Sequence, residues 1–334
     1  MLRSMLQALA LSACCAIAAC FAIAACFAIA TMSTQAHAEY PDKTVRFVVG
    51  FAPGGGADTL SRLFAKKLTA KWHQPVIVEN RPGANGSIAE DLVAHAPPDG
   101  YTIAWVTNAH TITPNQYKLN YDPIKDFEPI TSVASTCDVL LVPAASNITS
   151  IQDLLAKAKA SPGKLTFGSD GNGTLPYIEM ALLMQLTGVK MVGVAYNGGG
   201  PEMVALLGGE VELGWASLST SISEIQAGKL RALAVSTTKR SEIIPNVPTV
   251  AEATQLKGFD TREWFGVLAP AGTPKPIIDK IYADLMDALK EPDVQALLHA
   301  RNFEPGGETP AQFAKIADDD IKHWAEVLRG TKMN

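Results

Sequence analysis

Short apolar runs of strand length recur along this chain, and stretches with helical periodicity separate them. The predicted strands are Val45–Val49, Pro75–Glu79, Thr102–Val106, Val139–Val142, Leu165–Phe167, Met191–Ala195, Val211–Trp215 and Leu230–Val235. Between the first two, Leu60–Leu68 repeats its large apolar residues every three to four positions, which turns one helix face toward a sheet. This alternation predicts a doubly wound α/β fold with parallel strands.

Three positions carry the residue pattern of a helix N-terminus. The pairs are Ser150 with Asp153, Thr249 with Glu252, and Thr309 with Gln312, the last with Pro310 in between. Each pair has the spacing of a capping box, in which two side chains satisfy free backbone amides. Toward the end of the chain, Pro274–Leu289 and Thr309–Leu328 show helical periodicity only.

We expect two lobes rather than one wide sheet. The run Val139–Val142 ends in Pro143 ahead of a new helix start, and Phe265–Leu268 begins a late strand before Pro270. These stretches are the candidate crossovers between lobes. The prediction is a discontinuous first lobe of residues 39–140 and 262–334, an inserted second lobe of residues 141–261, and a ligand cleft between them.

The N-terminal segment has the pattern of an export signal. Arg3 is the only charged residue before Glu39, a long apolar run follows it, and Ala36–Ala38 supplies a small-x-small cleavage site. We therefore interpret residues 1–38 as a signal peptide and place the mature protein in the periplasm. A retained membrane span or a lipid anchor at Cys20 is the alternative, although the residues after Cys20 stay apolar where a lipidated protein has a polar tether.

Cysteine content and charge exclude several classes of protein. Of five cysteines only Cys137 lies outside the N-terminal segment, so no internal disulfide can form after cleavage. The 33 Asp and Glu outnumber 28 Lys and Arg, and the basic residues form no cluster. A nucleic acid partner is not expected, because binding to phosphates needs clustered basic residues.

The loop Phe51–Asp58 joins the first predicted strand to the first predicted helix. Its three consecutive glycines, Gly54, Gly55 and Gly56, expose backbone amides beside the positive end of the helix dipole, where an anion can bind. The loop lacks the third glycine of G-x-G-x-x-G and the Gly-Lys-Ser/Thr of a P-loop, so no nucleotide cofactor is expected. The alternative is a turn that needs glycine only for tight packing.

A similar loop, Gly168–Thr174, follows the strand Leu165–Phe167 and leads into a helix with Tyr177. Two more glycine turns occur at Arg81–Ser87 and at Tyr196–Pro201. Four such turns at strand ends, two in each predicted lobe, indicate one shared cleft.

Ordered motifs along the whole chain resemble those of one known family. They are Tyr40–Lys43, Phe51–Asp58, Val78–Ala84, Pro98–Tyr101, Tyr121–Pro123, Asp126–Phe127, Gly228–Val235, Val247–Glu252 and Ala269–Pro274. The chain resembles the Bug family, the receptors of tripartite tricarboxylate transporters. The resemblance implies a two-lobed periplasmic binding protein fold of the type II kind, closing on carboxylic acids, with a large and a small integral membrane subunit as partners and a monomeric receptor.

The same resemblance implies that the ligand is gripped by Phe51–Asp58 and by Ser169–Thr174. This chain departs from the family at two places, since Asp170 stands where relatives have a small residue and Tyr177 where they have a histidine. The predicted ligand contacts are Phe51, Pro53, Gly54, Gly55, Gly56, Asp58, Asn85, Thr107, His110, Ser169, Asp170, Gly171, Asn172, Gly173, Thr174, Tyr177 and Tyr196.

Some of these residues have a second interpretation. Asp58 is the residue type that caps a helix start, and this role is favoured over ligand contact. Asp170 beside an anion site is unfavourable unless backbone amides cap it or it faces a basic nitrogen of the ligand. His110 fits a surface or internally bonded histidine as well as it fits a ligand contact.

Two other functions remain possible at this stage. A periplasmic enzyme has little support, because the sequence has no Gly-x-Ser-x-Gly, no His-Glu-x-x-His and no metal-ligand spacing, and Cys137 fits a packing role better than a nucleophile. An extracytoplasmic sensor for a two-component system could use the same fold. Dicarboxylates, aromatic acids and amino acids all fit the predicted site.

Overall fold

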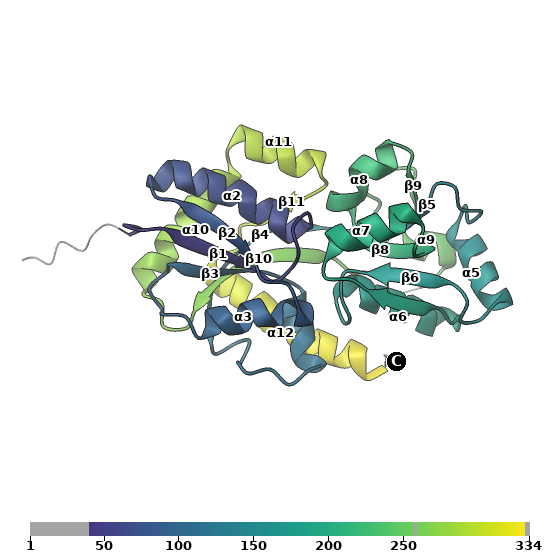
Figure 1. Ribbon diagram of the computed structural model, residues 1–334, viewed down its shortest axis with the longest axis horizontal. Coiled ribbons are helices and arrows are strands. Elements are labelled where there is room, and N and C mark those ends of the chain that lie inside the picture. The colour runs from purple at the N-terminus through teal and green to yellow at the C-terminus, as the bar shows by residue number, and fades with distance from the viewer. Residues whose placement is uncertain (1–39, 257–258, 331–334) are drawn as a thin grey trace, which may run out of the picture. The chain divides into compact units, whose positions relative to one another are not determined.

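The computed structural model describes residues 40–256 and 259–330, and the predicted signal peptide lies outside them. The part from Lys43 onward contains two separate β-sheets, each covered by helices (Figure 1). Within the described ranges, no helix combines the length and the apolar character needed to span a bilayer. We call each sheet with its helices a lobe.

The first lobe has a six-stranded sheet in the order β11-β4-β10-β3-β1-β2. Its strands are β1 (Val45–Val49), β2 (Val76–Asn80), β3 (Thr102–Thr107), β4 (Phe127–Thr136), β10 (Glu263–Pro270) and β11 (Glu304–Pro305). Its helices are α2 (Gly56–Trp72), η1 (Ala84–Gly86), α3 (Ser87–Ala94), α4 (Ala109–Ile112), η2 (Thr113–Asn115), α10 (Lys275–Leu289), α11 (Pro292–Ala300) and α12 (Pro310–Gly330).

Neighbouring residues of this sheet face opposite helices. Trp105 packs against Phe64 of α2, with ring centroids 5.6 Å apart. The next residue, Val106, packs instead in a cluster with Val93 of α3 and Phe313 of α12. Both faces of the sheet are therefore buried, which is why its central strands are almost wholly apolar.

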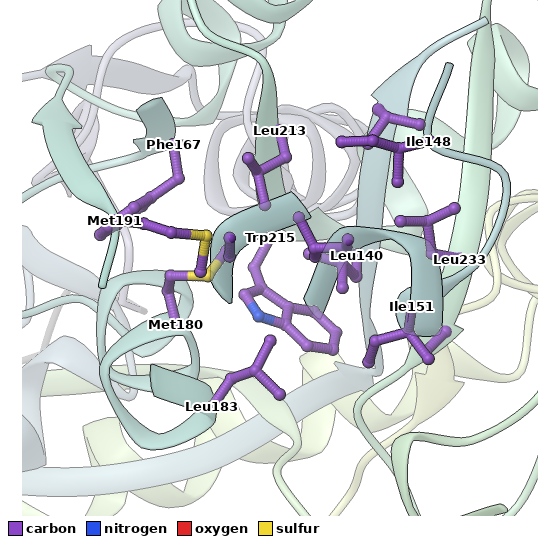
Figure 2. Packing of buried hydrophobic residues seen from close by; sticks show 14 of the residues in the cluster. Leu140, Ile148, Ile151, Phe167, Met180, Leu183, Met191, Leu213, Trp215 and Leu233 are labelled. Carbon is purple, nitrogen blue, oxygen red and sulfur yellow. The ribbon is translucent and has the colours of Figure 1, made fainter. Parts of the chain in front are cut away.

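The second lobe has a five-stranded sheet in the order β7-β6-β8-β5-β9. Its strands are β5 (Asp138–Pro143), β6 (Thr166–Ser169), β7 (Val192–Ala195), β8 (Leu213–Ser217) and β9 (Leu230–Val235). Its helices are α5 (Ile151–Ala160), α6 (Leu175–Thr187), α7 (Gly199–Gly208), α8 (Leu218–Gln226) and α9 (Val250–Thr254). Figure 2 shows the core on one face, where Trp215 packs beside Leu140 and Leu183.

All eight predicted strands overlap an observed strand, but the predicted parallel order holds for only part of each sheet. Parallel pairs join β1 to β2 and β3, and β6 to β7 and β8. The strands β4, β5, β9, β10 and β11 pair antiparallel. The expectation of purely parallel sheets is therefore wrong, because the strands that follow the crossings between lobes enter each sheet in the opposite direction.

The strand β4 escaped prediction because Thr131, Ser132, Ser135 and Thr136 dilute its apolar pattern. The chain leaves β4 of the first sheet and enters β5 of the second at Cys137, slightly before the predicted boundary at residues 140 and 141. It returns through β10, which begins at Glu263 beside the predicted boundary at residues 261 and 262.

The predicted helix starts are confirmed. The Ser150 side chain accepts a hydrogen bond from the Asp153 amide, and Thr249 with Glu252 forms a complete capping box. The Gln312 side chain accepts from the Thr309 amide at 2.9 Å and the Thr309 hydroxyl accepts in return at 3.4 Å. These local patterns fix the entry of α5, α9 and α12.

Candidate functional site

Glycine-rich turns from the two lobes meet. The turn after β1 lies against the turn before α7, where the Ala52 amide donates to the carbonyl oxygen of Asn197 at 3.2 Å. A Cβ atom on Gly200 would lie only 2.6 Å from the carbonyl oxygen of Pro53. Since backbone atoms cannot tolerate that distance, this close approach requires glycine at position 200.

Between these turns lies a cavity of about 30 Å³ that both lobes enclose, which we call the inner pocket. Five of the predicted contacts line it: Phe51, Gly55, Gly56, Thr107 and Asp170. The cavity has room for only one or two water-sized groups, so the lobes are closed in this structure. A ligand of several atoms requires the lobes to separate before it can enter.

Four helices begin at the inner pocket, namely α2, α6, α7 and α8, and residues from the first turn of each line it. The N-cap residues Gly55, Thr174, Gly198 and Ser217 make no side-chain capping bond to these helices. Free amides of a first helical turn and the helix dipole together attract negative charge. Pro176 and Pro201 have no amide hydrogen and the Leu218 amide donates to the carbonyl oxygen of Cys137, so it is the other first-turn amides around the inner pocket that are suited to hold an anionic group.

A second cavity of about 570 Å³ adjoins the inner pocket, and we call it the outer pocket. Phe51 and Asp170 line both cavities, so they mark the boundary between them. The outer pocket also contains the predicted contacts Asn85, Gly171, Asn172 and Tyr196. Lys118 is a charged side chain in its lining that the sequence interpretation did not consider.

Three carboxylates line the inner pocket: Asp170, Glu202 of α7 and Glu263 of β10. Burial raises the pKa of Asp170 to about 6, although the Thr174 hydroxyl opposes this shift. Burial, and then the nearby carboxylates, hold the pKa values of Glu202 and Glu263 well above their usual range. Each of the three has one buried oxygen without a hydrogen-bond partner among the described residues.

Two more buried carboxylates, Asp138 of β5 and Glu179 of α6, interact with this group. Burial raises the pKa of Glu179 to about 8, and its side chain accepts a hydrogen bond from the Thr261 hydroxyl. Burial and the Glu179 carboxylate raise the pKa of Asp138. The sequence interpretation missed Asp138, Glu179, Glu202 and Glu263, because nothing in the local sequence shows that they become buried together.

Asp58 lies outside both pockets and stabilises the first glycine loop. Its carboxylate accepts from the Gly54 amide at 3.1 Å, from Arg62 at 3.0 Å and from Asn80 at 2.9 Å. Burial disfavours the ionised form, but these bonds outweigh it and lower the pKa of Asp58. The expected capping role is wrong, because the N-cap of α2 is Gly55 and no side chain caps it, but Asp58 holds the loop in place rather than contacting a pocket.

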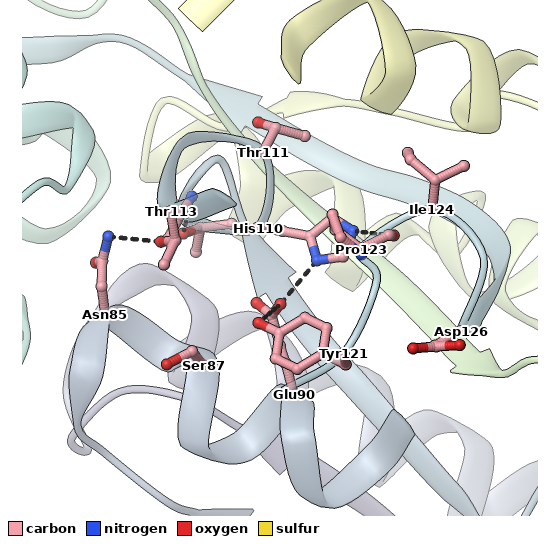
Figure 3. Close-up of polar contacts among 12 residues, drawn as sticks. Asn85, Ser87, Glu90, His110, Thr111, Thr113, Tyr121, Pro123, Ile124 and Asp126 are labelled. Carbon is pink, nitrogen blue, oxygen red and sulfur yellow. Dashed lines mark hydrogen bonds and ion pairs between the residues drawn. The ribbon is translucent and has the colours of Figure 1, made fainter. Parts of the chain in front are cut away.

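His110 does not reach the cleft. Its Nδ1 lies 2.8 Å from the Glu90 carboxylate and its Nε2 lies 3.0 Å from the carbonyl oxygen of Pro123 (Figure 3). Tyr121 donates to the same Glu90 oxygen at 2.7 Å. The prediction of His110 as a ligand contact is therefore corrected: both ring nitrogens are used inside the first lobe.

The remaining predicted residues support the cleft without lining either pocket. The hydroxyls of Ser169 and Thr174 donate to the carbonyl oxygen of Gly171 at 3.2 and 2.8 Å and so shape the second loop. Tyr177 packs on Phe167, with ring centroids 5.9 Å apart. The other three residues lie where the lobes touch: Pro53 and Gly54 against Gly200, and Gly173 against Gln116.

Residues 60–333 match the family described as "Tripartite tricarboxylate transporter family receptor". The chain belongs to this family. The receptor is 32% identical to Protein BugT of Bordetella pertussis over 295 residues, which cover 87% of this chain and 90% of the relative. The family resemblance drawn from the sequence is thereby confirmed.

Solved structures agree with the two-lobed fold of this receptor. A structure titled "R. palustris Rpa4515 with adipate" matches with a TM-score of 0.84 and 33% identity, covering 87% of this chain and 98% of that one. MatC from Rhodopseudomonas palustris with bound malate matches with a TM-score of 0.82 and 31% identity, covering 86% and 100%. The periplasmic binding protein BugD matches with a TM-score of 0.83 and 31% identity, covering 87% and 98%.

Cys137 of this receptor has no feature of a nucleophile. It is buried where the chain passes between the sheets, and burial raises the pKa of its thiol to about 12. A thiol with so high a pKa is protonated at neutral pH and reacts slowly. Cys137 therefore has the packing role that its sequence context predicts.

Proposed function

We propose that this receptor binds a small carboxylic acid between its lobes in the periplasm and delivers it to the large and small membrane subunits of a tripartite tricarboxylate transporter. The observation that carries this proposal is the set of four helix starts without side-chain caps at the inner pocket. Relatives described with adipate and with malate support a carboxylate as the ligand class.

The proposed anion contacts are backbone amides, because Gly55 and Gly56 line the inner pocket and Gly171 and Asn172 line the outer pocket. Four to six charge-assisted hydrogen bonds contribute about 1.5–3 kcal/mol each. That sum exceeds the several kcal/mol that association costs and leaves about micromolar affinity. The ring of Phe51, at the boundary of the two pockets, is the proposed apolar contact.

The ligand class is tested by a thermal-shift screen of the mature protein against mono-, di- and tricarboxylates, followed by calorimetry. A ligand that binds only the folded state raises the melting temperature. At a ligand concentration of 100 times its Kd, the free energy of unfolding increases by about 2.7 kcal/mol. The matched alcohols and amides of each acid are the controls. The proposal fails if no compound with a carboxylate shifts the melting temperature at millimolar concentration.

Delivery to a transporter is tested by uptake of the labelled ligand into cells with and without this chain. We expect that deletion abolishes high-affinity uptake and that the full-length chain restores it. A form that lacks residues 1–38, and therefore the proposed signal peptide, should restore nothing. Unchanged uptake together with a lost transcriptional response to the ligand would show a sensor instead.

A further inference from the structure

The inner pocket is lined by more acidic side chains than a site for a carboxylate alone needs, and burial keeps them protonated unless a positive group pairs with them. Glu202, Glu263 and Asp170 line it, and Asp138 and Glu179 interact with them from behind. A ligand carboxylate would add a further negative charge within a few ångströms of these groups, where the low dielectric strengthens repulsion. The ligand must therefore offset this charge or leave the acids protonated.

Among the described residues, no basic side chain lines the inner pocket to neutralise these acids. Of the residues that line the inner pocket, none is lysine, arginine or histidine. Two arginines of the first lobe have other partners, since Arg62 pairs with Asp58 at 2.9 Å and Arg262 pairs with Glu304. Lys118 lines the outer pocket but not the inner one. A positive group that would allow these acids to ionise therefore has to come from outside the chain.

The fold makes specific room for one of these acids. A Cβ atom on Gly168 would lie 3.1 Å from Cγ of Glu202, and one on Gly214 would lie 2.8 Å from its Oε1. Glu202 is 1% exposed, and this Oε1 has no hydrogen-bond partner among the described residues. Two glycines in adjacent strands thus accommodate a buried carboxylate whose Oε1 no described group satisfies, which is costly unless a ligand compensates.

The chemistry of these oxygens selects the kind of partner. An ionised carboxylate only accepts hydrogen bonds, so it needs a donor, and an ammonium group brings three donors with its positive charge. A metal ion does not fit, because no group of three His, Cys, Asp or Glu side chains in residues 40–256 and 259–330 is arranged to hold one. An organic cation with N–H groups remains.

We propose that the ligand carries a protonated amine, which Glu202 and Glu263 bind in the inner pocket with Asp170 at its edge, while its carboxylate lies against the uncapped helix starts. The ligand is thus an amino acid or a similar zwitterion, rather than a simple dicarboxylate. This inference rests on the proposed function and narrows its ligand class.

Calorimetry on the mature protein with matched probe pairs tests this inference. The pairs are glutamate with glutarate, 2-aminoadipate with adipate, and 4-aminobutyrate with butyrate. We expect the amine-bearing member of at least one pair to bind at least ten times more tightly than its partner. Equal or tighter binding of the amine-free acid in every pair that binds overturns the inference but leaves the proposed function intact; binding of no acid at all overturns both.

The variant Glu202→Gln tests whether the preference for an amine arises in the inner pocket. Its control is Glu210→Gln, which changes an exposed acid just after α7. We expect Glu202→Gln to weaken binding of the amine-bearing probe at least tenfold. Binding of the amine-free probe should be unchanged or tighter, and the melting temperature of the ligand-free protein should stay the same. If Glu202→Gln does not fold, Glu263→Gln is measured in the same way. Equal losses for both probes would show a structural role only and would overturn the inference.

Discussion

The inner and outer pockets belong to one cleft but differ in charge and burial. Three carboxylates and no basic side chain line the inner pocket. The outer pocket, with a volume of about 570 Å³, shares only Asp170 with that group and contains Lys118, Tyr117 and Tyr196. The same fold therefore offers a ligand two adjoining pockets with different side chains.

The two pockets show which ligand contacts come from the backbone of the fold and which come from individual side chains. Backbone amides at strand-to-helix turns come with the fold, so they can bind a carboxylate in any member that folds in this way. The carboxylates of the inner pocket are side chains, and their effect is strong because the site is buried. Changes in the inner pocket should consequently alter affinity far more than changes in the outer pocket.

The largest effect is expected from Gly200→Ala. This substitution prevents the two lobes from closing, so it affects both pockets at once. The new Cβ would lie 2.6 Å from the carbonyl oxygen of Pro53 across the cleft. We expect affinity for every ligand to fall by roughly 100-fold, or about 2.7 kcal/mol, with little change in ligand-free stability. Gly208→Ala is the control, because a Cβ there meets nothing within 4 Å at the end of the same helix. Unchanged affinity in calorimetry would show that the closed contact is dispensable.

The second prediction concerns the pH dependence of the ligand-free protein. The folded pKa values of Asp170 and Glu179, about 6 and about 8, lie above their usual values of 3.8 and 4.5. Stability from such groups is complete at low pH and is lost as pH rises through the folded pKa. We expect the melting temperature to fall by about 5 °C or more between pH 5 and pH 9, because one pKa unit is about 1.4 kcal/mol.

Glu179→Gln should reduce this decline, because it removes a carboxylate that is forced to ionise among Asp138, Asp170, Glu202 and Glu263. The exposed substitution Glu210→Gln should leave the decline unchanged. A melting temperature that rises from pH 5 to pH 9 in the unmodified protein would mean that the buried acids are not the dominant titrating groups.

Much of the fold follows from local sequence. The strand β5 is apolar from Val139 to Val142 because Leu140 faces one core and Leu141 the other, and such a run is recognisable without any tertiary information. The directions in which β4 and β10 pair cannot be recognised from the local sequence, because they depend on how the chain crosses from one lobe to the other and back. Strand pairing of that kind is set by contacts between residues far apart in the sequence.

The site was predictable only where its residues share a local motif. The loops around Gly55 and Gly171 are recognisable because each has three glycines just after a predicted strand. Glu202 and Glu263 stand in an amphipathic helix and at the start of a strand, where an acid usually faces water. One signal was present, since Glu202 follows the Gly198–Pro201 turn directly, but its burial depends on Gly168 and Gly214.

Asp170→Asn tests the role of the carboxylate at the boundary between the two pockets. Its effect on ligand affinity should be intermediate. The substitution removes one negative charge but keeps the size of the side chain that lines both cavities. We expect an amine-bearing ligand to bind about tenfold more weakly, equivalent to about 1.4 kcal/mol, and an amine-free acid to bind equally well or better. Asp279→Asn, on an exposed helix surface, is the matched control. Equal affinities in calorimetry would exclude Asp170 from contact with the amine.

The smallest effect is expected from Lys118→Met in the outer pocket. Lys118 is exposed, so water and salt screen its attraction for a ligand carboxylate, and such surface charges contribute about 0.2–1 kcal/mol. We expect two- to threefold weaker binding at low salt, and no difference from the unmodified protein at 0.5 M salt. Lys125→Met, another exposed lysine of the first lobe, should change nothing at either salt concentration. A tenfold loss that persists at high salt would mean that Lys118 is desolvated when the ligand binds, and the outer pocket would then be as decisive as the inner one.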